Sequence, residues 1–320
     1  MKILLAVDGS PYSEMATKTV KAFQLPSHTE VTVMTVVPEH TFLGRITLTM
    51  LIGGDAAREL AHKAQEQNAT ELLKGPVETL QASGVKVESL VRWGKPAEEI
   101  IKRAHEIGAH LVVIGASGTG DSPRFPLGSV AHKVMKYADT SVLLVREATS
   151  AMRRVLLATD GSKYSDEVAQ FLLDLPLPHK SQVFVVTALQ SHIAALMKTP
   201  TMDLETNQQL LAELRAAEEK VARSLMANSK KRFLEKGYEV SSMVLRGEPA
   251  QEILMLAETL TPDLIALGAK GLTATEAFLL GSVAQRVARF ARYSVLIGRA
   301  QGRPKLDNVG SPSGCPGQTV

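Results

Sequence analysis

The sequence is poor in cysteine, in aromatic residues and in long apolar runs. Of its 320 residues, one is cysteine (Cys315), one is tryptophan (Trp93) and 4% are aromatic. A lone cysteine excludes an internal disulfide and a CxxC metal site. No run is long and apolar enough to span a bilayer, and the apolar stretch after Met1 is too short for a signal peptide. We therefore expect a cytoplasmic protein that does not bind membranes.

Strong charge and the common catalytic motifs are also missing. The formal net charge is +3, without a block of like charges, so composition gives no reason to expect nucleic acid as a partner. HExxH and GxSxG do not occur, and His105, His110 and His132 do not fall at a metal-ligand spacing. We expect no resident metal and no catalytic residue; an enzymatic role would be at most that of a weak ATPase.

The chain instead repeats its own pattern. LLAVDGSPYSE (4–14) returns as LLATDGSKYSD (156–166), so that Asp8 maps onto Asp160, and HLVVIGASG (110–118) returns as DLIALGAKG (263–271). Order and spacing are kept over the whole copy, which is far longer than a solenoid unit. The chain is therefore predicted to be a tandem duplication.

Two domains and a tail follow from this repeat. The predicted domains are residues 1–148 and 152–300, and residues 301–320, rich in Gly, Pro and polar residues, are expected to be a disordered tail. The short connection between the domains favours close packing, and the last strands, SVLLV (141–145) and SVLIG (294–298), are predicted edge strands that pair within the chain.

Each copy alternates between apolar, β-branched runs and helical patterns. Strands that are apolar on both faces and joined by helices predict a parallel sheet covered on both sides, with right-handed crossovers and a doubly wound, Rossmann-like topology. Ser13 is the expected N-cap of the first helix, and Pro76 is expected to kink or split a later one. In the first copy the predicted strands are 2–8, 30–37, 85–93, 110–115 and 141–145, and the predicted helices include 13–23, 96–108 and 129–138.

A loop with the same glycine spacing in both copies, here called the glycine loop, follows the fourth strand of each copy. GASGTGDSPRFPLGS (115–129) and GAKGLTATEAFLLGS (268–282) share the pattern Gly-x2-Gly-x9-Gly-Ser, which is neither a Walker A sequence nor the GxGxxG fingerprint. Ligands of doubly wound sheets bind at the carboxyl ends of the strands. Glycines let a ligand approach the backbone, and the N-terminus of the next helix attracts phosphate. For one copy alone, turns and helix ends would explain the glycines equally well.

These motifs, in this order, resemble tandem proteins of the universal stress protein family over residues 1–300. The matching features are VDGS and TDGS, the GxPAxEI turn, the glycine loop and the final VLLV strand. The resemblance implies an α/β fold of two five-stranded sheets with strand order 3-2-1-4-5. In that family the glycine pattern marks the members that bind ATP, so ATP, ADP or AMP is the implied ligand, with Mg²⁺ or Mn²⁺ carried by its phosphates.

The resemblance also implies which positions form each site. Asp8 would lie near the base and ribose, although its simpler role is to shape the turn before Gly9. In the first copy the implied ligand-binding residues are Asp8, Val36, Ile114, Gly115, Gly118, Gly128, Ser129 and Val130. In the second copy they are Asp160, Ala188, Leu267, Gly268, Lys270, Gly271, Gly281, Ser282 and Val283.

The copies differ inside the loop. Asp121 of the first copy would repel phosphate, whereas Lys270 of the second would either donate to phosphate or point into solvent. The sequence therefore favours the second site. The resemblance implies a stress-response regulator whose nucleotide state changes its contacts with an unknown protein partner. The two domains are expected to pair within the chain, and the chain could also form a homodimer. A scaffold with empty pockets and a slow ATPase are the alternatives.

Overall fold

The structure is a computed structural model, and it describes residues 1–23, 25–26, 28–38, 55–119, 127–149, 151–175, 177–190, 208–272 and 280–299. The elements of the first half are β1 (Lys2–Ala6), α1 (Pro11–Ala22), β2 (Glu30–Pro38), α3 (Asp55–Gln81), β3 (Lys86–Gly94), α4 (Pro96–Glu106), β4 (Leu111–Gly115), α5 (Ser129–Tyr137) and β5 (Ser141–Val145). Those of the second half are β6 (Arg154–Ala158), α6 (Lys163–Asp174), β7 (Gln182–Leu189), α8 (Gln208–Glu235), β8 (Glu239–Arg246), α9 (Pro249–Leu260), β9 (Leu264–Gly268), α10 (Ser282–Phe290) and β10 (Ser294–Gly298). The described residues do not include Asp121 or the tail, residues 301–320.

The predicted α/β topology is confirmed in both halves. The first half has the strand order β3-β2-β1-β4-β5 and the second half has β8-β7-β6-β9-β10, with parallel neighbours throughout each half. Apolar runs such as KILLA form these strands because alternate side chains enter the cores on the two faces of the sheet.

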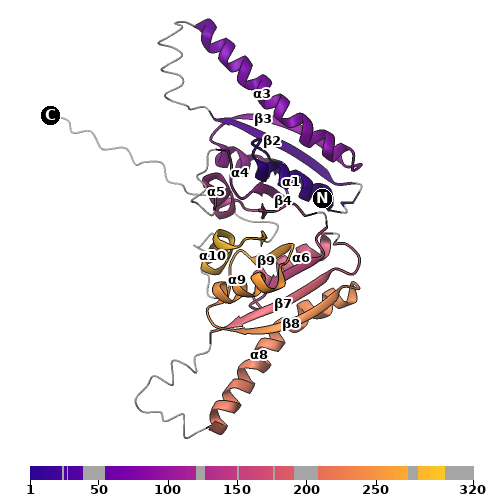
Figure 1. Cartoon of the computed structure of the whole chain (residues 1–320), viewed down its shortest axis with the longest axis vertical. Coiled ribbons are helices and arrows are strands. Elements are labelled where there is room, and N and C mark those ends of the chain that lie inside the picture. Colours follow the sequence, from indigo (N-terminus) through magenta and orange to yellow (C-terminus); the bar gives the residue numbers. More distant parts are fainter. Residues whose placement is uncertain are drawn as a thin grey trace, which may run out of the picture.

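The two sheets join into one sheet of ten strands. Edge strands β5 and β10 pair antiparallel, with Leu143 opposite Leu296 and Val142 opposite Ile297. Figure 1 shows the halves related by an approximate twofold at this junction, with α3 and α8 at the two far ends. The predicted pairing of the last strands is therefore present, and it covers the free edges of β5 and β10, so that β3 and β8 are the edges of the joined sheet.

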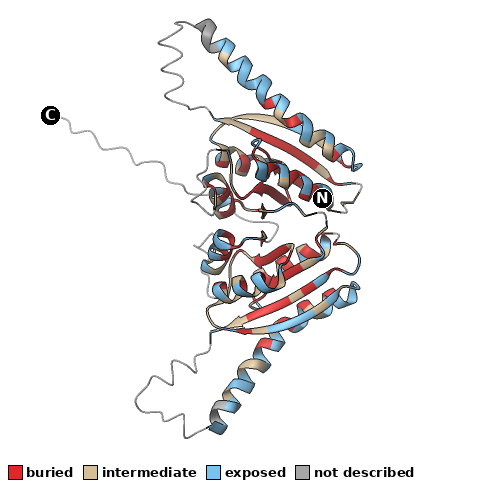
Figure 2. Cartoon of the chain, viewed as in Figure 1, coloured by how far each residue is buried: buried red, intermediate tan, exposed pale blue. Residues whose placement is uncertain are grey.

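The core has two layers that run through both halves. One layer lies under α4, α5, α9 and α10, and the other under α1, α3, α6 and α8. At the junction Val142 and Leu144 enter the first layer and Leu143 enters the second, each almost fully buried. Figure 2 shows the burial concentrated along the central strands and the outer surfaces of the long helices exposed. Each of the two core layers thus continues across the junction.

One local prediction was wrong, and a second was wrong in one of its two alternatives. The N-cap of α1 is Ser10, whose hydroxyl accepts a hydrogen bond of 3.2 Å from the Ser13 N–H, so Ser13 already lies inside the helix. Pro11 occupies the first turn, where a missing N–H costs no helical hydrogen bond. Helix α3 runs unbroken through Pro76 (Figure 1), so the proline does not split it. Among the described helices, none has the length and apolar character that crossing a membrane would need.

Candidate functional site

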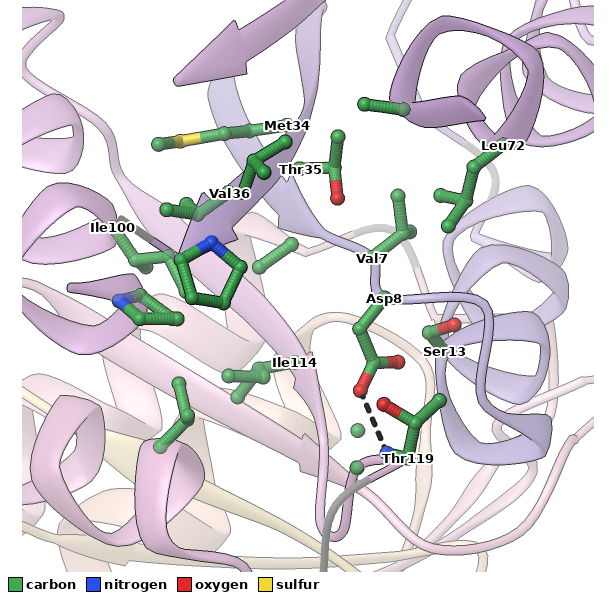
Figure 3. A pocket seen from close by; sticks show the side chains of 18 of the residues that line it. Val7, Asp8, Ser13, Met34, Thr35, Val36, Leu72, Ile100, Ile114 and Thr119 are labelled. Atoms are coloured by element: carbon green, nitrogen blue, oxygen red, sulfur yellow. Dashed lines mark hydrogen bonds between the residues drawn. The ribbon is translucent and has the colours of Figure 1, made fainter. Parts of the chain in front are cut away.

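An aspartate connects two loops at the carboxyl edge of each half of the sheet. Asp8 follows β1; one carboxylate oxygen accepts a 3.0 Å hydrogen bond from the Ser10 N–H and the other a 3.1 Å bond from the Thr119 N–H (Figure 3). Asp160 follows β6 and repeats this pattern with the N–H groups of Ser162 and Leu272, at 3.0 and 2.9 Å. Each aspartate therefore shapes its turn and also fixes the start of the glycine loop.

A cavity of about 520 Å³ opens beside Asp8. Figure 3 shows Met34, Val36, Ile100 and Ile114 gathered on one side of it, with Asp8 between this apolar group and Ser13. Its size and composition, mostly apolar with a few polar groups, are those of a small-molecule site. Of the residues predicted for this site, the cavity is lined by Asp8, Val36, Ile114, Gly115, Gly118, Ser129 and Val130.

The equivalent cavity of the second half has a volume of about 670 Å³. Every residue predicted for the second site lines it: Asp160, Ala188, Leu267, Gly268, Lys270, Gly271, Gly281, Ser282 and Val283. The sequence offset thus places the same positions around a cavity in both halves. Only Gly128 of the predicted set is not in a lining; it is buried, and its N–H donates a 2.7 Å hydrogen bond to the Ala116 carbonyl.

The structure shows a second reason why glycine is needed at these loop positions, besides access for a ligand. A Cβ on Gly115 would lie 2.7 Å from the Tyr12 Cβ, and one on Gly268 would lie 2.9 Å from the Tyr164 backbone. These two glycines are needed for the close packing of the first helix of each half against the fourth strand. A Cβ on Gly271 would lie 2.6 Å from the Asp160 carboxylate, so this glycine allows the aspartate to reach the loop.

The helices that follow the glycine loops begin without a side-chain cap. Gly128 and Gly281 are the N-caps of α5 and α10, and neither helix receives a hydrogen bond from a capping side chain. By contrast, serines cap α1 and α6. A helix N-terminus that no side chain caps directs backbone N–H groups and the positive end of its dipole at the cavity. This arrangement suits an anion such as a phosphate.

Lys270 distinguishes the second site from the first. It lines the cavity, and its ammonium lies 5.9 Å from the centre of the Tyr164 ring, which Lys163 also approaches, at 5.1 Å. The equivalent residue in the first cavity is Ser117. The positive charge favours phosphate at the second site. Asp121, predicted to oppose phosphate at the first site, lies outside the described residues.

Some lining residues were not predicted. Gln65 and Asn68 reach the first cavity from α3, and Thr35 from β2. Gln65 and Asn68 stand three positions apart, a spacing that puts them on one helix face, but no pattern in the sequence indicates that this face meets the cavity. Glu248 lines the second cavity; it caps α9 and pairs with Arg286 at 3.0 Å. Among the described residues no group of three or more His, Cys, Asp or Glu is placed to hold a metal.

Comparison with known proteins identifies the fold and the family. The Universal stress protein family matches the chain twice, at residues 1–146 and 152–299. The chain belongs to the universal stress protein family. The two matches agree with the halves of the sheet, so this universal stress protein carries the family domain in tandem.

Single-domain relatives correspond to about half of this universal stress protein. Universal stress protein MJ0577 of Methanocaldococcus jannaschii is 31% identical over 159 residues, which cover 47% of this chain and 96% of that protein. A putative universal stress protein of Staphylococcus aureus, SAUSA300_1656, is 32% identical over 146 residues, covering 45% and 82%. The crystal structure of a universal stress protein from Archaeoglobus fulgidus has a TM-score of 0.61 at 21% identity and covers 94% of this chain and 96% of its own, which shows the shared two-domain fold.

Proposed function

We propose that this universal stress protein binds ATP or another adenine nucleotide in its two cavities. The observation that carries the proposal is that one arrangement occurs twice: an apolar cavity beside an aspartate, a glycine loop and a helix N-terminus without a side-chain cap. The apolar side next to Val36 or Ala188 suits the flat face of a base, and the helix N-terminus suits the phosphates.

The roles of the chain's residues follow from their places. Backbone N–H groups at the start of α5 and α10 would hold the phosphates, and Lys270 would add a charge-assisted contact in the second site. The described part of the chain offers no metal-ligand group of its own, so Mg²⁺ or Mn²⁺ would arrive with the phosphates. The protein would act in the cytoplasm as a regulator whose nucleotide state changes its binding of a protein partner.

Calorimetry and thermal melts test the proposal. A ligand that binds only the folded state adds about 2.7 kcal/mol of stability at a hundredfold excess over its Kd, so ATP with Mg²⁺ should raise the melting temperature. Mass spectrometry of ligand released from the purified protein identifies the native nucleotide. An unchanged melting temperature with ATP, ADP and AMP at millimolar concentration, and no nucleotide released, would support a scaffold with empty pockets instead.

A further inference from the structure

Two exposed aromatic side chains occupy equivalent places in the two halves. Tyr137 is the last residue of α5 and Phe290 the last residue of α10, and they are 50% and 53% exposed. Each has a cation beside its ring: the Lys136 ammonium lies 5.1 Å from the centre of the Tyr137 ring, and the Arg289 guanidinium 5.4 Å from that of Phe290. Both copies therefore expose an aromatic ring with an adjacent cation to solvent, although exposed apolar surface is unfavourable in water.

The two pairs flank the junction on one side of the sheet. Arg299 donates to the carbonyl of Lys136, next to Tyr137, and Arg146 donates to the carbonyl of Arg289, next to Phe290. Figure 1 shows α5 and α10 side by side across the junction. Burial, followed by the positive charges of Lys136 and of Arg289 across the junction, lowers the pKa of His132 on α5. We call Lys133, Lys136, Tyr137, Arg289 and Phe290 the junction face.

The junction face carries three positive charges and no negative one. Neither helix contains an acidic residue: their sequences are SVAHKVMKY and SVAQRVARF. Two acidic groups near these helices pair with other arginines, Glu248 with Arg286 and Glu258 with Arg292. Asp139 lies 2.7 Å from His105, and Glu147 acts on Tyr293 beyond the end of α10. Within the described part of the chain, Lys133, Lys136 and Arg289 have no ion-pair partner.

We propose that the junction face binds an acidic polypeptide segment that carries apolar side chains. Charge complementarity selects acidic residues, and the two aromatic rings with adjacent cations provide the kind of contact that forms the centre of protein interfaces. A second copy of this chain on the same face would bring like charges together. Three unpaired cations are also fewer than the four to eight that typically direct a segment to anionic lipid. The proposal does not depend on nucleotide binding.

The probe is a short fluorescein-labelled peptide of Glu, Asp, Leu and Phe, measured by fluorescence anisotropy against the whole protein. A peptide with Lys in place of the acidic residues, and one with Ser in place of Leu and Phe, are the comparison peptides. We expect the acidic, apolar peptide to bind at least about tenfold more tightly than either, and to lose most of its affinity when salt rises from about 50 to about 500 mM, because exposed charges are screened.

Variants locate the binding surface. Lys136→Glu with Arg289→Glu, and separately Tyr137→Ser with Phe290→Ser, should each weaken binding at least about tenfold. Lys18→Glu with Lys220→Glu makes the same change of charge on exposed positions of α1 and α8, which cover the other face of the sheet, and should leave affinity unchanged. Circular dichroism and melting temperatures confirm that each variant folds.

Three outcomes would overturn the proposal. The first is equal affinity for the acidic, apolar peptide and for the peptide with Lys in place of the acidic residues. The second is stronger binding to vesicles containing phosphatidylserine than to the peptide, lost in the Tyr137→Ser and Phe290→Ser variant, which would assign the face to a membrane. The third is concentration-dependent dimerisation, seen by sedimentation, that the same variant abolishes, which would assign the face to a second copy. Nucleotide affinity, measured in parallel, should not change in any junction-face variant.

Discussion

The side chain of Arg146 donates a hydrogen bond of 2.7 Å to the carbonyl of Ala288, in the other half of the chain. Arg299, at the equivalent position of the second half, donates in return to the carbonyl of Met135, which is the counterpart of Ala288. Burial lowers the pKa of Arg146, and lowers that of Arg299 to about 10, so both remain charged at neutral pH. The two arginines therefore fix the C-terminal ends of α10 and α5 at the junction.

Replacing Arg299 should weaken the junction. Arg299→Ala removes the donor for the carbonyls of Met135 and Lys136, and a hydrogen bond to a charged group contributes about 1.5–3 kcal/mol. We expect the free energy of unfolding, measured in urea, to fall by about this amount. Arg299→Lys should restore little, because an ammonium lacks the planar fork of donors.

The control for this experiment is Arg292→Ala. The Arg292 side chain is 77% exposed and pairs with Glu258 at 3.4 Å, an interaction expected to contribute at most about 1 kcal/mol. Equal losses for Arg292→Ala and Arg299→Ala would show that the reciprocal contacts do not stabilise the junction.

Removing the Asp160 carboxylate should loosen the second glycine loop. In Asp160→Ala the N–H groups of Ser162 and Leu272 lose their acceptor, so their amide hydrogens should exchange faster. Exchange at the Ala269 N–H, which bonds to the Gly298 carbonyl, should stay slow. Unchanged exchange at Leu272 would contradict the role that the geometry gives to Asp160.

A side chain at Gly271 should disable the second site. Gly271→Val places its Cβ where the Asp160 carboxylate lies, so the carboxylate and the loop must move. We expect calorimetry to show one ATP bound in place of two, and a larger loss of total binding than in Gly118→Val, because Lys270 favours phosphate at the second site.

Gly75→Ala is the matched control for the glycine variants. No atom lies within 4 Å of a Cβ at Gly75, which is inside α3, so alanine should fit and keep both sites. Full ATP binding by a folded variant with both Gly118 and Gly271 replaced would refute the site. Two sites of equal affinity in the wild type would refute only the ranking.

Glu167→Met should stabilise the protein at neutral pH. One carboxylate oxygen of Glu167 is buried and has no partner among the described residues. Burial raises the pKa of this carboxyl; the charge of Lys163 acts against this rise and that of Asp166 adds to it. Met15 stands at the equivalent position of α1 and packs against the core. We expect a gain on the order of 1 kcal/mol, since an unsatisfied buried polar group is unfavourable.

The gain should depend on pH in a defined direction. A carboxyl with a raised pKa in the folded state destabilises the fold above that pKa and has no such effect once it is protonated in both states. The advantage of Glu167→Met in melting temperature should therefore be largest at neutral pH and shrink as the pH falls towards the ordinary glutamate range. A gain that is constant with pH would mean that packing alone explains it.

The sequence by itself determined the duplication and the alternation of strands and helices. These features follow from local patterns, because apolar runs, helix periodicity and glycine spacing are properties of neighbouring residues. The strand order and the positions around the two cavities came from the resemblance of the motifs to the family. The repetition of these motifs, at an offset of 152 residues at Asp8 and 153 at Gly118, placed Asp160 and Gly271 as soon as Asp8 and Gly118 had been placed. The nucleotide assigned to these cavities remains a prediction.

Only the tertiary structure decided how distant residues meet. Three contacts join segments that are far apart in the chain. Arg146 donates to the carbonyl of Ala288, Tyr12 packs closely against Gly115, and Gln65 reaches the first cavity. Such contacts depend on how whole helices and strands pack, and neighbouring residues do not encode that packing. The register of β5 on β10, with Leu143 opposite Leu296, was decided in the same way: the sequence predicted that these strands pair but not which residues face one another.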